Sequence, residues 1–551
     1  GDWVERQILE ATPDGYRLRA GADVPLPDDI HHLLLRRIEL LTEQSVDPET
    51  PAGPALLSLE LAAAQGQEID RKEWKAVCRY RGFEASHDVV ETLVVNRLAR
   101  LTPRGWSFFH GALREGLERL AKESGRWADH HRTCAYVLLE LYPAERPGIA
   151  RRLAWHWLQA EDLEAALSPL LQAAEEFRHN YRFDHAIALL EQREEAMRRL
   201  CLAEDDPRWA EGWVPRSIVM ANMEEKERAT ELLDRAERSA RHYDWPGVLA
   251  ECAYGRAVMA KRAGAFDECE RWVGDALVHY EAVSDRLGIA KSHHVLGSLG
   301  HWTGHFEEGQ MHFEKANALF EELHDIRGMA LCAQGMAGIA NRVGDFDGAE
   351  RFIQRAIGGF EACGDRAGIM NCLNSLGELH RHRGDLARAE RYYERVVRVI
   401  ERGDMGGTHL VAYFNLGLVL LMKKDFEGAH SILSKLLDRL LVSHREGMLA
   451  MAHAHLAPCC AAADAWEDFD HHLSQAGEYI KAQGIVHKDI AVVIEMAADI
   501  AGDAGETARV EAAYALALDQ WKRLGELERA SELERRKREK EKRPQLLGNV
   551  E

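Results

Sequence analysis

Small, bulky and polar residues recur along most of this chain at intervals of 40 positions. One phrase marks each interval: it reads Gly-Ala-Phe from Gly264, Gly-His-Phe from Gly304, Gly-Asp-Phe from Gly344 and Gly-Asp-Leu from Gly384. Fainter versions follow at the next two intervals. A fixed period of this length is typical of supersecondary units that stack on one another. The pattern therefore predicts that most of the chain is a solenoid.

Two columns of small residues flank the marker glycine in successive repeats. The column seven positions before it contains Ala257, Gly297, Ala337, Gly377, Gly417 and Ala457, and the column five positions after it contains Cys269, Gly309, Ala349, Ala389 and Ala429. A small residue at a fixed helical position lets a neighbouring helix approach closely. We therefore expect two antiparallel helices in each repeat. The glycine provides a left-handed cap that ends the first helix, and Asp345, Asp385 and Asp425 can cap the start of the second.

This spacing of small and large residues resembles the tetratricopeptide repeat in its longer form of roughly 40 residues. The resemblance covers about 206–526 and weakens at both ends, as expected where a terminal repeat caps a stack. It implies an α-α superhelix in which the first helix of each repeat lines a concave surface.

The chain ahead of the repeats consists of shorter segments. An apolar helical stripe begins at Ile30, behind the capping residue Asp29. Further helices are predicted at 55–64, 71–81 and 89–100, followed by an extended turn at 101–110. Short helices followed by a hairpin predict a winged-helix unit over 29–127. The predicted fold class is therefore all-α, with a winged-helix-like N-terminal module followed by an α-α superhelix of tetratricopeptide repeats.

Three segments of this N-terminal region, 1–6, 24–31 and 105–115, resemble the region that follows the nucleotide-binding core in bacterial signal-transduction (STAND/AAA-type) ATPases. In that family the ATPase core, the winged helix and the helical repeats follow in this order. Many bacterial members carry a serine/threonine protein kinase domain in front. The resemblance implies that 1–28 is the trailing segment of an absent ATPase module. The other predicted domains are an irregular helical bridge at 128–205, the repeats at 206–526 and a charged tail at 527–551.

Composition and motifs limit the activities expected of this chain. Asp and Glu outnumber Lys and Arg by 91 to 70, and the net charge of −21 argues against a whole surface that binds nucleic acid or anionic membranes. The sequence has neither a run of 18 apolar residues nor an apolar leader, which predicts a soluble cytoplasmic protein. A phosphate loop and the kinase and hydrolase motifs do not occur. We therefore expect no enzymatic activity and no cofactor.

Cysteine and histidine residues do not form a recognisable metal motif. The ten cysteines include no C-x-x-C pair, and Cys252, Cys332 and Cys372 share one repeat column, which is typical of small buried residues. Pairs of adjacent histidines begin at His31, His130, His293 and His471. None of these pairs has a second pair one helical turn away to complete a tetrahedral set. No metal site is predicted.

The first helices place polar residues at equivalent positions of four successive repeats. Near the helix ends these are Lys261, Arg262, His301, Trp302, Asn341, Arg342, Arg381 and His382, and seven positions earlier they are Tyr254, His294, Gln334 and Asn374. In an acidic chain, such a row predicts a positive stripe and a groove for a protein or peptide partner, in particular an acidic or C-terminal peptide. The structural alternative is that cations in a last helical turn only oppose the helix dipole.

Together these features predict the non-catalytic regulatory arm of a signalling ATPase or kinase. A partner in the groove would bias the superhelix, and the winged helix would pass this bias to an upstream nucleotide-binding module. Two other classes remain open. A free-standing tetratricopeptide scaffold would bind partners without such a module. A transcription regulator would place helix 89–100 on DNA, although its outward residues Glu91, Asn96 and Arg97 include few cations.

Overall fold

The computed structural model describes residues 9–12, 15–18, 52–85, 87–109, 111–143, 146–223, 225–402, 410–443 and 446–547. The chain divides into two units, Gly1–Glu176 with Ile187–Gly212, and Phe177–Ala186 with Trp213–Glu551. The helix predicted from Asp29 and the segments 1–6 and 24–31 lie outside the described residues. Ahead of residue 52, the described part is a short antiparallel hairpin of β1 (Leu9–Thr12) and β2 (Gly15–Leu18).

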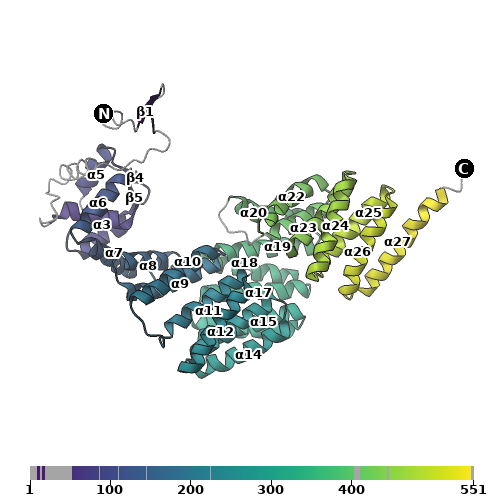
Figure 1. Ribbon diagram of the computed structural model, residues 1–551, viewed down its shortest axis with the longest axis horizontal. Helices are drawn as coiled ribbons and strands as arrows, with labels where there is room; N and C mark the ends of the chain where they lie inside the picture. Colours follow the sequence, from purple (N-terminus) through teal and green to yellow (C-terminus); the bar gives the residue numbers. More distant parts are fainter. Residues whose placement is uncertain are drawn as a thin grey trace. The chain divides into compact units, whose positions relative to one another are not determined.

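A three-stranded sheet packed among short helices forms the first part of the first unit (Figure 1). Its elements are α3 (Pro54–Gln65), β3 (Glu68–Asp70), α4 (Arg71–Tyr80), α5 (His87–Val95), β4 (Ala99–Thr102), β5 (Gly105–Phe108) and α6 (Gly111–Glu123). The central strand β5 pairs antiparallel with both β3 and β4. Trp106 on β5 meets Trp74 on α4 edge to face, with ring centroids 5.6 Å apart, and both rings are buried. Glycine is required at position 105, because a Cβ there would lie 2.1 Å from the carbonyl oxygen of Ile69.

Two sequence-based predictions for this part need correction. The helix predicted at 89–100 ends at Val95, and Ala99–Thr102 instead forms strand β4. Arg97 adopts φ 56° between them, so the chain turns at a left-handed residue that no glycine marks. Strand β3 was not predicted, because its three residues directly precede α4 and Asp70 also caps that helix. The extended turn predicted at 101–110 is confirmed as the β4–β5 hairpin.

Regular helices continue through the region that was predicted to be an irregular bridge. They are α7 (Trp127–Leu141), α8 (Ile149–Gln159), α9 (Leu163–His179), α10 (Phe183–Arg199) and α11 (Arg208–Asn222). Glu161, Tyr181 and Cys201 follow the ends of successive helices and have positive φ angles. Their even spacing is half of the repeat period, so the helix-turn-helix rhythm of the repeats is already present here.

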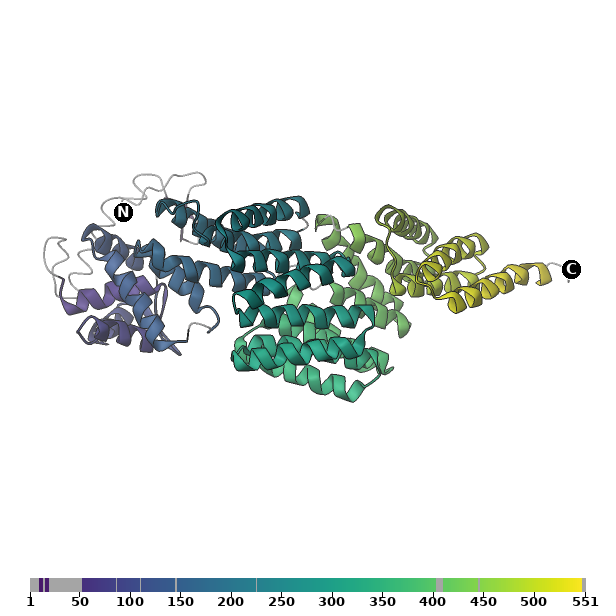
Figure 2. The ribbon, with the colours of Figure 1, turned by 90° about the horizontal axis from the view of Figure 1, so that it is seen from below.

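The second unit is a stack of helical hairpins whose helices lie side by side (Figures 1 and 2). Its helices are α12 (Lys226–Tyr243), α13 (Pro246–Arg262), α14 (Phe266–Ala282), α15 (Arg286–Thr303), α16 (Phe306–Glu322), α17 (Ile326–Arg342), α18 (Phe346–Cys363), α19 (Arg366–His382), α20 (Leu386–Glu401), α21 (Val411–Met422), α22 (Phe426–Ser443), α23 (Glu446–Ala462), α24 (Trp466–Gln483), α25 (Lys488–Asp503), α26 (Thr507–Arg523) and α27 (Leu527–Leu547). Helix α27 occupies most of the predicted charged tail, and its Arg529 and Arg536 bond to the buried carboxylate of Glu495 on α25.

The predicted columns of small residues are the contact rows between these helices. A Cβ added to Gly297 would lie 2.6 Å from the ring of Phe313, and one added to Gly377 would lie 2.5 Å from the ring of Tyr393. Between α15 and α16 the backbones themselves touch, because a Cβ on Gly300 would lie 2.6 Å from the Cα of Gly309. Close packing therefore fixes the small residues of these columns.

The helix caps follow the prediction and extend it. Gly264, Gly304, Gly344 and Gly384 all have φ between 72° and 86°, and Asp345, Asp385 and Asp425 each accept a backbone hydrogen bond at the start of the next helix. The first helices are capped in the same way by Asp285, Asp325 and Asp365. Aspartates thus cap both kinds of helix in the middle of the stack.

Within the part of the chain that the structure describes, no helix combines the length and apolar character needed to cross a membrane.

Candidate binding surface of the repeats

Hydrogen bonds link several residues of the predicted polar row to the neighbouring repeats. Arg262 donates a hydrogen bond to the side-chain oxygen of Asn222, 40 residues earlier. The ring of His382 lies 3.3 Å from the Oδ1 atom of Asn341, and the amide of Asn415 donates to Oδ1 of Asn374 at 2.9 Å. The stack therefore aligns these positions one above another, as the period implied.

The predicted positive stripe included histidines, but the structure lowers the pKa of His294 and of His301. Burial is the main cause that lowers the pKa of His294, to about 3, with Lys261 and Arg327 as further causes. Burial and then Arg342 lower the pKa of His301, and burial also lowers that of Lys261. At neutral pH the arginines therefore carry the charge of the row, while His294 and His301 are neutral.

The remaining row positions differ in exposure. Trp302 is 63% exposed, and Arg342 is also exposed. Gln334 and Arg381 are half-buried. The row thus offers an exposed indole and an exposed guanidinium at neighbouring repeats, together with partly covered polar groups.

Residues 177–186 are a further segment of the same unit, and they pack against the repeats. The pKa of His179 is lowered well below its usual value by burial first, and then by the charges of Arg178, Arg327 and Lys291. Tyr181 packs against the hydrophobic core of the later repeats. The sequence did not reveal that this segment packs against the repeats.

A cavity of about 830 Å³ lies elsewhere in the second unit, between α12, α13 and α14 on one side and α23 with the end of α24 on the other. Its apolar lining includes the half-buried side chains of Met259, Trp272, Met448 and Met451. Its polar lining includes Lys226, Arg256, Arg262 and Glu268. The superhelix therefore brings helices from distant parts of the sequence to one cavity.

The charges around this cavity are unequally neutralised. Arg256 already bonds to Asp234 at 2.6 Å and to Glu237 at 2.8 Å, and its guanidinium lies 5.1 Å above the ring of Trp272. Arg262 instead contacts the neutral amide of Asn222. The cavity thus combines a wall of aromatic and methionine side chains with the guanidinium of Arg262. The contact of Arg262 with Asn222 leaves its positive charge un-neutralised, whereas Arg256 is paired with carboxylates.

Of the predicted groove residues, Arg262 is the one that lines this cavity. Sequence reasoning missed Arg256, Trp272, Met448 and Met451. The first two belong to no recurring polar column, and the two methionines lie on α23, which only the turn of the superhelix brings near α13. No local pattern in the sequence indicates such a meeting.

The adjacent pair His471 and His472 on α24 meets a third histidine, His453 on α23. One ring nitrogen from each of His453, His471 and His472 lies within 4.8 Å of those of the other two. The Nδ1 atoms of His453 and His472 are 2.8 Å apart. A related pair, His293 and His312, lies between α15 and α16 with Nδ1 atoms 3.1 Å apart.

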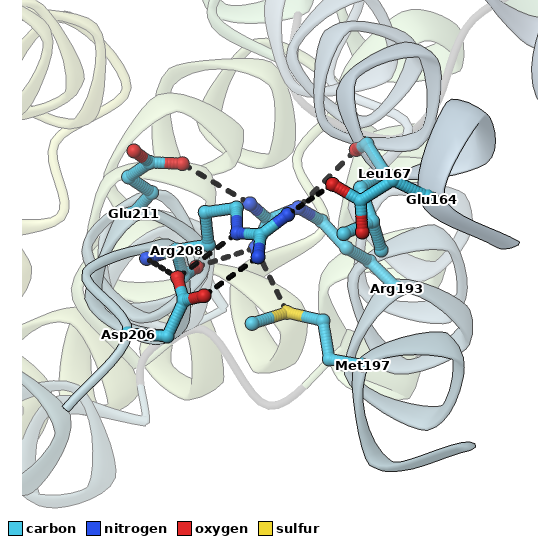
Figure 3. Close-up of polar contacts among 7 residues, drawn as sticks. All are labelled: Glu164, Leu167, Arg193, Met197, Asp206, Arg208 and Glu211. Atoms are coloured by element: carbon cyan, nitrogen blue, oxygen red, sulfur yellow. Dashed lines mark hydrogen bonds and ion pairs between the residues drawn. The ribbon is translucent and has the colours of Figure 1, made fainter. Parts of the chain in front are cut away.

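A buried arginine in the first unit joins α9, α10 and α11 (Figure 3). Arg193 is 2% exposed and donates to the carbonyl oxygens of Leu167 at 3.2 Å and Arg208 at 2.7 Å. It also donates to the carboxylate of Glu211 at 3.2 Å. Burial lowers the pKa of Arg193 below its usual value, while the charge of Glu211 opposes this shift. Its donors are satisfied by backbone and carboxylate oxygens, so this cluster positions helices.

A basic hollow of about 530 Å³ lies on the sheet-containing part of the first unit. Its lining consists of Asp70, Arg71, Lys72, Lys75, Arg79 and Arg104. Five cations and one carboxylate thus surround the start of α4 and the tip of the β4–β5 hairpin, although the chain as a whole is acidic.

Comparisons with known proteins concern the repeats. Residues 329–402 and 367–441 match the tetratricopeptide repeat family. No curated protein matches the chain.

Several solved structures are similar to the chain at low identity. A signal transduction ATPase with numerous domains (STAND) protein with a tetratricopeptide repeat sensor from Pyrococcus horikoshii is 14% identical, over 81% of this chain and 67% of that chain, with a TM-score of 0.48. A Rap protein complexed with Competence and Sporulation Factor is 13% identical, over 68% and 98%, with a TM-score of 0.44. NprR in complex with its cognate peptide NprX is 13% identical, over 62% and 94%, with a TM-score of 0.42. The chain thus contains tetratricopeptide repeats within an all-α repeat superhelix.

Proposed function

We propose that the second unit binds a protein or peptide partner and that the cavity between α13 and α23 receives the partner's anchoring side chain. The observation that carries this proposal is the cavity of about 830 Å³ with a mixed apolar and cationic lining. Its size lies within the range of sites that enclose a ligand, which is about 300–1,000 Å³. The proposed role is binding, without catalysis in this chain.

The lining favours a peptide with an apolar anchor next to an acidic group. Met259, Met448 and Met451 have unbranched, polarizable side chains that adapt to different apolar shapes. Trp272 adds a rigid aromatic surface. Arg262 can bond a carboxylate in the bidentate manner because its present partner is neutral. A C-terminal carboxylate meets the same requirement as an acidic side chain.

The test uses the full chain and a fluorescently labelled peptide library with an apolar residue before a C-terminal carboxylate. Met451→Gln and Arg262→Glu should each weaken binding of a selected peptide by about tenfold or more, since each removes one part of the anchor site. Arg342→Glu is the matched control, because Arg342 is exposed on the polar row and does not line the cavity. Circular dichroism checks that each variant keeps its helicity.

Retained affinity in both cavity variants, with loss in Arg342→Glu, would move the binding site to the polar row. Failure of every library peptide to bind the wild-type chain would refute a peptide anchor in this cavity.

We further propose that the repeats regulate a signalling ATPase or kinase, with a winged-helix module in the first unit passing on their state. The order α3, β3, α4, α5, β4, β5 and the pairing of β5 with both other strands support the winged-helix assignment. Deleting 213–547 from a longer protein that carries an upstream nucleotide-binding module should alter nucleotide turnover or its regulation. Unchanged turnover and regulation would refute this role.

A second candidate function is contact with nucleic acid through the basic hollow of the first unit. Five cations on α4 and the β4–β5 hairpin favour it, since phosphate contacts dominate such binding. Duplex DNA should then bind with a steep salt dependence, and Lys75→Glu with Arg79→Glu should abolish it. Absence of binding at low salt would exclude this candidate.

A further inference from the structure

The three histidines between α23 and α24 form a compact set of nitrogen donors. His453 lies on α23 and is 5% exposed, while His471 and His472 lie at adjacent positions of α24 and reach the surface. One ring nitrogen from each residue lies within 4.8 Å of the other two. Two helices of one hairpin thus hold three imidazoles around one point, at the edge of the protein where an ion can enter.

We propose that His453, His471 and His472 bind one divalent late transition metal ion, with Zn²⁺ as the ion that the site fits best. Imidazole is a preferred ligand of Zn²⁺, Cu²⁺ and Ni²⁺, and three histidines with one further ligand form a tetrahedral zinc site. Asp468 lies one helical turn before His472 and shares its side of α24. Its carboxylate or a water molecule supplies the fourth ligand.

For the facing pair His453 and His472, metal binding requires only a small change in the observed geometry. The Nδ1 atoms of His453 and His472 are 2.8 Å apart, in a hydrogen bond that one ring donates and the other accepts. Nitrogens bound at 2.0–2.1 Å to a tetrahedral ion lie about 3.3 Å from each other. The rings must therefore part by about half an ångström, and the donating ring must move its proton to Nε2. This tautomer change leaves the number of bound protons unchanged.

The site would fasten α23 to α24 beside the proposed peptide cavity. Met448 and Met451 line that cavity from the same helix as His453. A bound ion would cross-link the wall that carries these two methionines. The metal site does not depend on the proposed peptide function, because its donors do not line the cavity.

The chain contains a matched control four repeat periods earlier. His293 and His312 occupy the positions that correspond to His453 and His472, and their Nδ1 atoms are 3.1 Å apart. The position that corresponds to His471 is occupied by Met311, whose side chain is 43% exposed. This hairpin therefore has two of the three imidazoles and should not hold the ion.

The experiment titrates the untagged full chain with Co²⁺ and follows the visible absorption of tetrahedral cobalt, with Zn²⁺ competition as a second readout. We expect one equivalent of Co²⁺ that Zn²⁺ displaces. His471→Ala changes an exposed ligand, so folding should be retained, and affinity should fall by about tenfold or more. His293→Ala should leave the titration unchanged. Met311→His should add a second equivalent, because it supplies the missing third imidazole.

Several results would overturn the proposal. One is a wild-type chain that shows no tetrahedral Co²⁺ spectrum, and another is a His471→Ala chain that binds with wild-type affinity. Equal loss in His293→Ala and His471→Ala would show adventitious binding by surface histidines. A single equivalent in Met311→His would contradict the claim that the third histidine completes the site. Peptide binding is measured separately on the metal-free wild-type chain. If the peptide binds there, a failed metal titration refutes the metal site alone and leaves the peptide proposal standing.

Discussion

The two units fix their charged side chains over different distances along the chain. In the first unit, Glu60 bonds to Arg126 and His130, which are 66 and 70 residues away, and Glu73 bonds to Arg152, 79 residues away. In the second unit the corresponding ion pairs span about one repeat. Examples are Arg327 with Asp365, Arg383 with Glu350 and Arg509 with Asp470, at separations of 38, 33 and 39 residues.

The two units are therefore stabilised in different ways, the repeats by contacts between neighbours and the first unit by contacts between distant segments. A stack of repeats is held by contacts between neighbours, so its stability is close to a sum of local terms. The first unit instead depends on a few buried groups that join distant segments, and the loss of one should be felt throughout it. Changes in the first unit should therefore be large and widespread, and changes in the repeats should be smaller and local.

The largest expected effect is that of Glu60→Ala. The side chain of Glu60 is fully buried and bonds to both Arg126 and His130, so its removal leaves the half-buried guanidinium of Arg126 without its partner. Breaking such a pair costs about 3–5 kcal/mol. Hydrogen exchange measured by mass spectrometry should show faster exchange in both α3 and α7, with the repeats unaffected.

The matched control is Glu123→Ala, which breaks a solvent-exposed i,i+4 pair with Arg119. This change should cost less than about 1 kcal/mol. If hydrogen exchange in α3 and α7 is equally fast in the Glu60→Ala and Glu123→Ala variants, the first unit does not depend on the buried contacts of Glu60.

In the repeats the corresponding test is Gly300→Ala. The new Cβ would lie 2.6 Å from the Cα of Gly309 on the neighbouring helix, and a backbone cannot move aside as a side chain can. Overpacking of this kind costs about 1–3 kcal/mol. Faster exchange should be confined to α15, α16 and the adjacent hairpins. Gly274→Ala is the control, since a Cβ there meets nothing within 4 Å, and it should be neutral or slightly stabilising. Exchange that spreads over the whole stack in Gly300→Ala would contradict local stability.

The same contrast explains how far the sequence could be interpreted. The repeat period was visible because Gly264, Gly304, Gly344 and Gly384 mark the turn inside each repeat. The half-period was less visible, because the turns between repeats use Asp244, Ser284 and His324 in the left-handed region, and glycines stand there at Gly364 and Gly484. Backbone hydrogen bonds close these turns without requiring glycine, so composition does not reveal them.

The candidate sites show the same limit. The polar row could be predicted because its members lie one period apart, and contacts such as His382 with Asn341 confirm that spacing. The cavity could not be predicted from the sequence. The curvature of the superhelix brings Met451 and Trp272 to one cavity from distant parts of the chain. The histidine cluster had a signal that went unused, since the spacing between positions 293 and 312 recurs between positions 453 and 472. This spacing connects facing positions of the two helices of a hairpin.

Acid should weaken the first unit in two stages. Burial, followed by the charges of His130 and Lys122, lowers the pKa of His131 to about 3, so the folded state resists its protonation. Stability from this group is present above the unfolded pKa of about 6.5 and declines as the pH falls below it, by about 2 kcal/mol at pH 5.

The second stage comes from Glu60. Burial alone would raise its pKa, but the hydrogen bonds and charges of His130 and Arg126 outweigh burial and hold the pKa below 4.5. Its contribution is therefore lost only below about pH 4.5. His131→Asn keeps a donor at the position of Nδ1, which faces His156 at 3.0 Å, and cannot become charged. Unfolding measured between pH 7 and 5 should depend less on pH in this variant. An unchanged slope would assign the acid sensitivity to other groups.

The smallest effects should come from the aspartates that cap the repeat helices. Asp345 is exposed and accepts one backbone hydrogen bond, from Gly348 at 2.9 Å, so Asp345→Ala should cost about 1 kcal/mol. Asp365 accepts the equivalent bond from Gly368 but is 5% exposed and also holds Arg327 at 2.8 Å. Its replacement by alanine should cost more than that of Asp345, because a half-covered guanidinium then loses its partner. Chemical denaturation of the two variants measures the difference. If Asp345→Ala lowers the free energy of unfolding as much as Asp365→Ala, the lost helix cap alone accounts for the effect. The ion pair between Arg327 and Asp365 in neighbouring repeats then adds nothing to the stability of the stack.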